Sequence, residues 1–68
     1  MNDVKPSRIL RGAVFLWQNL FGTDEHGKTV KTSRVVGRHA PNIFETENTI
    51  YTVEFVPGGE TTIPEEWR

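Results

Sequence analysis

The stretch T-I-Y-T-V-E-F-V at residues 49–56, followed by P-G-G at residues 57–59, indicates the fold most clearly. Its β-branched and aromatic residues are typical of a strand. Strict alternation points Tyr51, Val53 and Phe55 to one side and the polar residues between them to the other. Pro followed by two Gly is a strong turn signal. The segment therefore predicts a strand with one buried face that ends in a tight turn.

Turn signals divide the chain before and after this strand into further short segments. Residues 24–27, D-E-H-G, have Asp at the first position and Gly at the fourth, as a type I turn prefers. The Thr- and Val-rich segment 28–36 then predicts a strand. Two more short strands are expected at residues 43–46 and 60–63, each next to a turn signal.

The segment 8–22 fits two interpretations. As a helix, its apolar residues fall at three- and four-residue spacing, with Ser7 as the N-cap and Gly22 as the stop. As a strand, it is rich in β-branched and aromatic residues, and Gly12 marks a bulge or bend. Gly12 inside a helix would cost about 1 kcal/mol relative to Ala.

Pairing with the next segment favours the strand. A hairpin closed by the D-E-H-G turn would place Phe21 opposite Val30 and Trp17 opposite Arg34. It would also place Phe15 opposite Val36. These are favourable cross-strand pairs, and Trp17 with Arg34 could form a cation–π contact. We therefore predict a long twisted hairpin here.

The predicted fold is all-β: a small five-stranded antiparallel meander that forms a barrel or half-barrel over residues 8–68. Residues 1–7 are polar, contain a Pro, and are predicted to form a flexible arm. The alternative is an α+β fold in which a helix at about residues 8–21 packs on a β-meander.

The C-terminal third also resembles a known type of fold. P-E-E-W at residues 64–67 predicts one helical turn, because Pro presets φ and acidic residues favour its first positions. Together with Y-T-V-E-F at residues 51–55 and P-G-G at residues 57–59, this tail resembles the closing hairpin of SH3-like small barrels. The resemblance covers residues 51–67 and implies a small barrel in which Trp67 closes one end of the core.

Composition limits the chain to one small folded domain. It has 68 residues, 35% of them hydrophobic, and no Cys, so disulfides are excluded. A chain of this size buries a small core, which leaves self-association as an option for added stability. No apolar run is long enough for a membrane span, and no signal peptide is recognisable. We therefore expect a cytoplasmic protein without a membrane partner.

Charge is unevenly distributed although the net charge is only −1. Residues 1–38 contain seven basic and three acidic residues, a net of +4, and residues 39–68 contain one basic and six acidic residues, a net of −5. Such a split can indicate a nucleic-acid partner, or two faces that attract each other within or between copies.

One segment matches a phosphate-binding motif. G-T-D-E-H-G-K-T at residues 22–29 fits G-x-x-x-x-G-K-[ST]. The motif requires a strand, the loop and then a helix, whereas here Asp24 and Glu25 would repel phosphate and a strand-like segment follows. The context therefore predicts a hairpin turn rather than a nucleotide site.

We find no catalytic or metal-binding constellation. His26 and His39 are predicted to lie far apart along a hairpin, and the scattered glutamates lack the deep pocket that raises the pKa of a general acid. We therefore predict no catalytic residues, no metal site and no cofactor.

Basic and aromatic side chains supply candidate binding residues. Four basic residues follow one another along the predicted strand, namely Lys28, Lys31, Arg34 and Arg38. Small barrels can present such a strand, with an aromatic side chain, to single-stranded nucleic acid. Aromatic side chains can equally line a groove for a peptide. The candidate binding residues are Trp17, Arg34, Arg38 and Trp67.

Three functions are compatible with these features. The first is a non-catalytic binding module that recognises a protein partner or a second copy of itself. The second is a single-stranded nucleic-acid binder that uses the basic strand. The third is a small oligomeric enzyme with an intersubunit site, as in the small plasmid-borne dihydrofolate reductases, which are SH3-like tetramers with a central pore.

Overall fold

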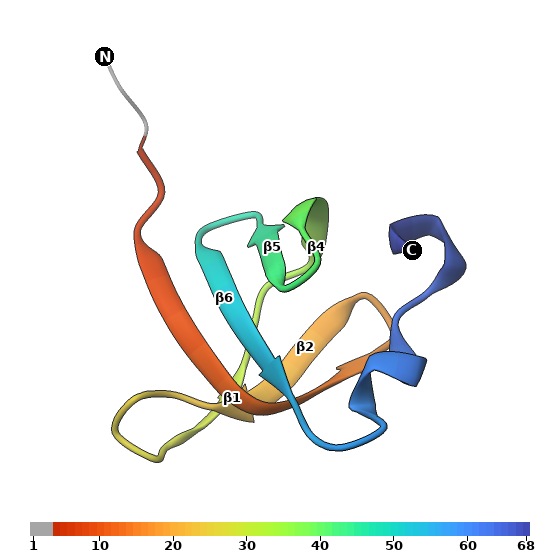
Figure 1. Cartoon of the computed structure of the whole chain (residues 1–68). Helices are drawn as coiled ribbons and strands as arrows, with labels where there is room; N and C mark the ends of the chain where they lie inside the picture. The colour runs from red at the N-terminus through yellow and green to blue at the C-terminus, as the bar shows by residue number, and fades with distance from the viewer. Residues whose placement is uncertain (1–3) are drawn as a thin grey trace.

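The computed structural model describes residues 4–68, and about half of these residues lie in strands (Figure 1). Two short 3₁₀ turns, η1 and η2, follow the last strand, and residues 4–68 contain no α-helix. The elements are β1 (Ser7–Leu16), β2 (Asn19–Thr23), β3 (Thr29–Lys31), β4 (Val35–Ala40), β5 (Ile43–Thr46), β6 (Ile50–Phe55), η1 (Gly59–Thr62) and η2 (Glu65–Trp67).

All six strands belong to one mixed sheet in the order β3-β2-β1-β6-β5-β4. Four neighbouring pairs are antiparallel, but β1 and β6 run parallel. The prediction of a mostly β domain is confirmed. The prediction of five strands in an antiparallel meander is wrong, because the sheet has six strands and one parallel pair. The chain leaves β3, crosses over and builds β4–β5–β6 on the other side of β1, and this crossover makes the β1–β6 pair parallel.

An unpredicted turn at Trp17-Gln18 changes the first hairpin. It ends β1 and starts β2, so Phe15 lies opposite Leu20 rather than opposite Val36. The β2–β3 register also differs by one residue, with Phe21 opposite Lys31. The predicted Trp17–Arg34 pair is therefore wrong, because Trp17 lies in a turn and not in a strand.

The alternative helix at residues 8–21 is also wrong, because β1 and β2 cover this segment. Gly12 has a φ of 58° and lies where the ladders from β1 to both neighbours shift register. The predicted bulge at Gly12 is thus confirmed. It bends β1, so that its first half pairs with β6 while its second half pairs with β2 (Figure 1).

The sheet curls strongly. Its two outermost strands, β3 and β4, are separated in the chain by only three residues. These residues stay beside the first hairpin, since the Thr32 amide donates to the Leu20 carbonyl (2.9 Å) and the Val35 amide donates to the Gln18 carbonyl (2.8 Å). The start of β4 is therefore held against the Trp17-Gln18 turn.

The concave side of the curled sheet holds the core. Phe44 on β5 is fully buried, and its ring makes edge-to-face contacts with Phe15 (5.5 Å between centroids) and Phe55 (5.9 Å). The predicted alternation in β6 is confirmed, because Tyr51 and Val53 are buried while the polar residues between them are exposed.

The tail of the chain folds over one end of this core (Figure 1). The prediction of a strand at residues 60–63 is wrong, because η1 occupies this segment. The hydroxyls of Thr61 and Thr62 donate to the carbonyls of Gly58 and Gly59, respectively. These local bonds favour a 3₁₀ turn over a strand. The helical turn at η2 is confirmed, with Trp67 packed against the core.

The N-terminal segment is partly described. Residues 1–3 of the predicted arm lie outside the described residues. Lys5 donates to the carbonyl of Thr46 (2.9 Å), and the carbonyl of Pro6 accepts from the Ile50 amide (2.9 Å). The arm is therefore attached to the sheet from Lys5 onward.

No helix in the described part of the chain has the length and apolar character that crossing a bilayer requires.

Candidate functional site

Trp17 occupies the tip of the β1–β2 hairpin in an unusual state. Its side chain is 86% exposed, and its φ is 62°. Among residues 4–68 it is the one residue other than Gly with a positive φ. The left-handed region costs an ordinary residue about 1–2 kcal/mol, and a bulky aromatic residue is rare there. Neither burial nor backbone preference explains a Trp at this position.

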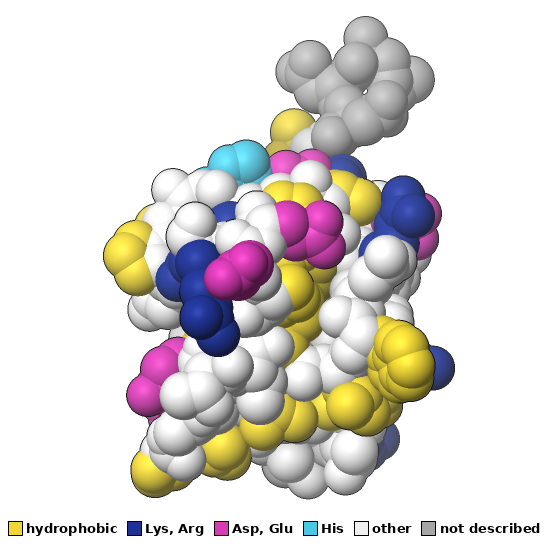
Figure 2. Space-filling model, turned by 90° about the vertical axis from the view of Figure 1, so that its right-hand side faces the viewer, with side chains coloured by type: hydrophobic (Ala, Val, Ile, Leu, Met, Phe, Trp, Pro, Cys, Tyr) yellow, Lys and Arg dark blue, Asp and Glu magenta, His cyan; other side chains and the backbone are white. Residues whose placement is uncertain are grey.

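Further apolar residues surround the tip. Leu16 is 51% exposed and Val36 is 41% exposed. The bond from the Val35 amide to the Gln18 carbonyl holds the start of β4 against the turn, and Gln18 and Val36 line a common hollow. On the side that Figure 2 turns toward the viewer, apolar side chains are exposed between acidic and basic ones.

A small hollow lies next to the tip. It has a volume of about 250 Å³ and is lined by Gln18, Arg34, Val35, Val36, Glu66 and Trp67. Small-molecule sites are usually about 300–1,000 Å³. The hollow is therefore closer in size to a single side chain than to a whole ligand. We call Leu16, Trp17 and the residues that line this hollow the Trp17 face.

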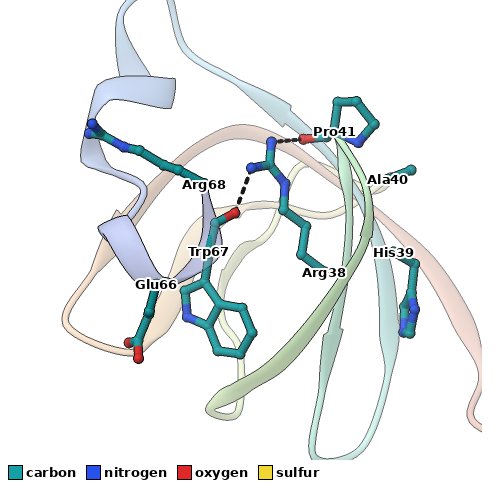
Figure 3. Close-up of a pocket in the computed structure, with 7 residues that line it drawn as sticks. All are labelled: Arg38, His39, Ala40, Pro41, Glu66, Trp67 and Arg68. Carbon is teal, nitrogen blue, oxygen red and sulfur yellow. Dashed lines mark hydrogen bonds between the residues drawn. The ribbon is translucent and has the colours of Figure 1, made fainter.

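Arg38 holds the tail in place. Its guanidinium donates one bond to the Trp67 carbonyl (2.6 Å) and one to the Pro41 carbonyl (2.6 Å), as Figure 3 shows. It also lies over the Phe44 ring, 5.1 Å from the centroid. Both terminal nitrogens are thus engaged within the chain, and Arg38 has a structural role in joining β4 to η2.

A larger and more open hollow of about 560 Å³ lies beside Arg38, between the β4–β5 turn and η2. His39 belongs to its rim, but its ring points away from Trp67 (Figure 3). The two terminal nitrogens of Arg38 are already bonded to carbonyls, so these nitrogens would have to leave the Trp67 and Pro41 carbonyls to bond a ligand here.

The structure brings three of the four predicted binding residues close together. Trp67 lines both hollows, Arg34 lines the smaller one, and Arg38 lines the larger one. Trp17 is next to Gln18 at the edge of the smaller hollow, and neither of the two cation–π contacts in residues 4–68 involves it.

The basic strand is divided among different surroundings. Lys28 lies in the β2–β3 turn, Lys31 lies over the Phe21 ring (5.8 Å), and Arg38 holds the tail. Arg34 is the one member that belongs to the Trp17 face. These residues do not form a continuous basic stripe along one strand.

The segment with the phosphate-binding pattern forms the β2–β3 turn, as predicted. One carboxylate oxygen of Asp24 accepts bonds from the amides of His26 (2.8 Å) and Lys28 (2.9 Å). The Lys28 amide is the main cause that lowers the pKa of Asp24 below its usual value, and the His26 amide adds to it. The loop's own carboxylate thus occupies amides that a phosphate would need.

A second carboxylate joins three elements. Glu45 on β5 forms an ion pair with Lys5 and a hydrogen bond with His39, whose Nε2 lies 2.7 Å from a Glu45 oxygen. The pKa of Glu45 is lowered, chiefly by the bond from Lys5 and then by that from His39. Residues 4–68 hold no group of three or more His, Asp or Glu side chains arranged to bind a metal ion.

Sequence patterns missed several members of the Trp17 face, namely Leu16, Gln18, Val36 and Glu66. The missing signal was the turn itself, because neither Trp17 nor Gln18 is a residue that turns prefer. A place where the local sequence contradicts the local backbone is often a functional or strained site.

Comparison of the chain with protein-family models, with curated proteins and with solved structures finds no match. The resemblance of the tail to SH3-like barrels therefore stays a prediction, and function has to be argued from the Trp17 face itself.

Proposed function

We propose that this chain is a non-catalytic binding module that recognises a protein through the Trp17 face. The observation that carries the proposal is the state of Trp17, which is 86% exposed and has a left-handed backbone conformation. Strain of this kind persists where the surrounding structure imposes it, and it concentrates at functional positions. Trp is also among the residues that contribute most to protein interfaces.

The surroundings of Trp17 support a protein partner. Leu16, Trp17 and Val36 are three of the five large hydrophobic residues that are exposed in residues 4–68. An apolar centre with a polar rim is typical of protein interfaces. Arg34 and Glu66 supply such a rim, with one charge of each sign.

Nucleic acid fits this surface less well. A single-strand binder needs several basic side chains along the path of the backbone, whereas Arg34 shares its hollow with Glu66, and Arg38 is bonded to two carbonyls. Affinity that falls steeply with salt would be the mark of that alternative.

Site-specific photo-crosslinking in cells tests the proposal. A photoreactive residue in place of Val36 is expected to form discrete protein adducts, and these should disappear when Trp17→Gly is added. The matched control places the photoreactive residue at Glu25, in the turn at the other end of β2. Adducts that are removed by nuclease, or that persist without Trp17, would contradict the proposal.

A further inference from the structure

The Trp17 face combines a projecting side chain with a recess of similar size. Trp17 projects from the hairpin tip. The neighbouring hollow of about 250 Å³ has a mixed lining, with three apolar residues beside three polar or charged ones: Val35, Val36, Trp67, Gln18, Arg34 and Glu66. Trp17 does not fill this hollow itself, because 86% of its surface is exposed. The molecule therefore has a projection and a recess side by side on the same face.

This arrangement is self-complementary. In a two-fold symmetric dimer, both subunits use the same patch, so each contact occurs twice. Trp17 directly precedes Gln18, which lines the hollow. A two-fold axis that passes between the projection and the recess would place each Trp17 over the hollow of the other copy.

The charges at the rim match the same symmetry. Arg34 and Glu66 both border the hollow, and within residues 4–68 neither of them takes part in an ion pair. Two copies facing each other can pair Arg34 of one with Glu66 of the other, twice. Arg34 can in addition lie over the inserted indole ring as a cation–π partner.

Size and net charge are compatible with such a dimer. A stable interface covers about 800 Å² on each partner, which is roughly a sixth of the 4702 Å² surface of this domain. The net charge of −1 produces little repulsion between copies.

We infer that the partner recognised by the Trp17 face is a second copy of this chain, in an isologous dimer that inserts Trp17 of each copy into the hollow formed by Arg34, Val36 and Trp67 of the other. This inference rests on the proposed function and specifies its partner.

The test is the molar mass of the whole chain in solution, measured by light scattering over a concentration series. The mass is expected to rise toward twice the 7.8 kDa of the single chain, and Trp17→Gly should keep it at the monomer value. An amide NMR spectrum of this variant checks that it is folded. A wild-type monomer up to about 1 mM, or a dimer that persists without Trp17, would overturn the inference.

Charge reversal gives a second and independent test. Arg34→Glu and Glu66→Arg should each weaken dimerisation by about tenfold, because like charges then face each other across the interface. The double variant should recover most of the wild-type affinity. A dimer indifferent to the single reversals, or a double variant no better than the single ones, would overturn this geometry.

The two proposals can fail separately. If the chain is monomeric but Val36 still crosslinks to another protein in a Trp17-dependent way, the dimer is refuted and the binding function stands. If neither a dimer nor a Trp17-dependent protein adduct forms, both are refuted.

Discussion

At the scale of single residues, Trp17 departs most from what folding requires. A hairpin tip with a positive φ suits Gly or Asn, yet this chain places an exposed indole there. The local sequence of the turn offers no preference that would have predicted it. The exposed state of Trp17 therefore had to come from the structure, although its candidacy as a binding residue came from the sequence.

Replacement of Trp17 by Gly is expected to stabilise the monomer by about 0.5–1 kcal/mol, because relief of the left-handed strain exceeds the entropy cost of Gly. Urea unfolding, at concentrations too low for association, measures this. Gln18→Gly is the matched control in the same turn and should destabilise the fold by about 0.5–1 kcal/mol. A less stable Trp17→Gly monomer would mean that the indole contributes to folding.

Gly59 is a second residue whose identity the packing dictates. A Cβ there would lie 2.8 Å from the Ala13 carbonyl oxygen and 2.9 Å from a Val56 methyl carbon. We expect Gly59→Ala to lower the free energy of unfolding by about 1–3 kcal/mol. At Gly37 the nearest atom is 3.8 Å away, so Gly37→Ala should change stability little. Equal losses at both positions would contradict the close packing of η1 on β1.

At the scale of elements, the sequence predicted the features that depend on a few neighbouring residues. These are the D-E-H-G turn at residues 24–27, the alternation in β6 and the bulge at Gly12. The parallel β1–β6 pair and the crossover that creates it depend on contacts between distant segments. No short pattern encodes them, and the antiparallel meander was therefore wrong.

The β2–β3 turn allows a test by pH. Because the pKa of Asp24 is lowered in the folded state, its charge stabilises the fold above the ordinary Asp pKa of about 3.9, and this contribution is lost as pH falls through the lower folded value. We would measure the urea midpoint of unfolding between pH 7 and pH 3. At neutral pH the midpoint of the wild type should be higher than that of Asp24→Asn.

The difference between these two proteins should shrink toward the acid end of the range. Glu25→Gln, which changes a charge in the same turn without touching the bonds of Asp24, should leave the midpoint at pH 7 nearly unchanged. A difference between wild type and Asp24→Asn that grows on acidification would contradict this account of the turn.

At the scale of the whole molecule, the tail completes the fold. After β6, η1 packs on β1 and η2 reaches β4, where Arg38 bonds the Trp67 carbonyl. This connection also places Trp67 and Glu66 in the wall of the smaller hollow. The sequence predicted that Trp67 would pack on the core, but not that it would share a surface with Arg34.

Arg38→Lys is expected to cost about 1–2 kcal/mol of stability, because an ammonium group cannot bond both carbonyls in the fork geometry of a guanidinium. Arg34→Lys is the matched control, since Arg34 is exposed, and should stay within about 0.5 kcal/mol of wild type. Urea unfolding of the monomers compares the two. Equal effects would show that Arg38 does not hold the tail.

The central claim is that two copies of the chain pair through the Trp17 face. Its most direct test is fluorine NMR over a concentration series, with the two Trp residues of the chain replaced by 5-fluorotryptophan. The account predicts that the signals of Trp17 and Trp67 both shift as concentration rises, with the same midpoint, because one ring enters the hollow that the other lines. A Trp17 signal that keeps its dilute, solvent-exposed position up to about 1 mM would contradict the claim.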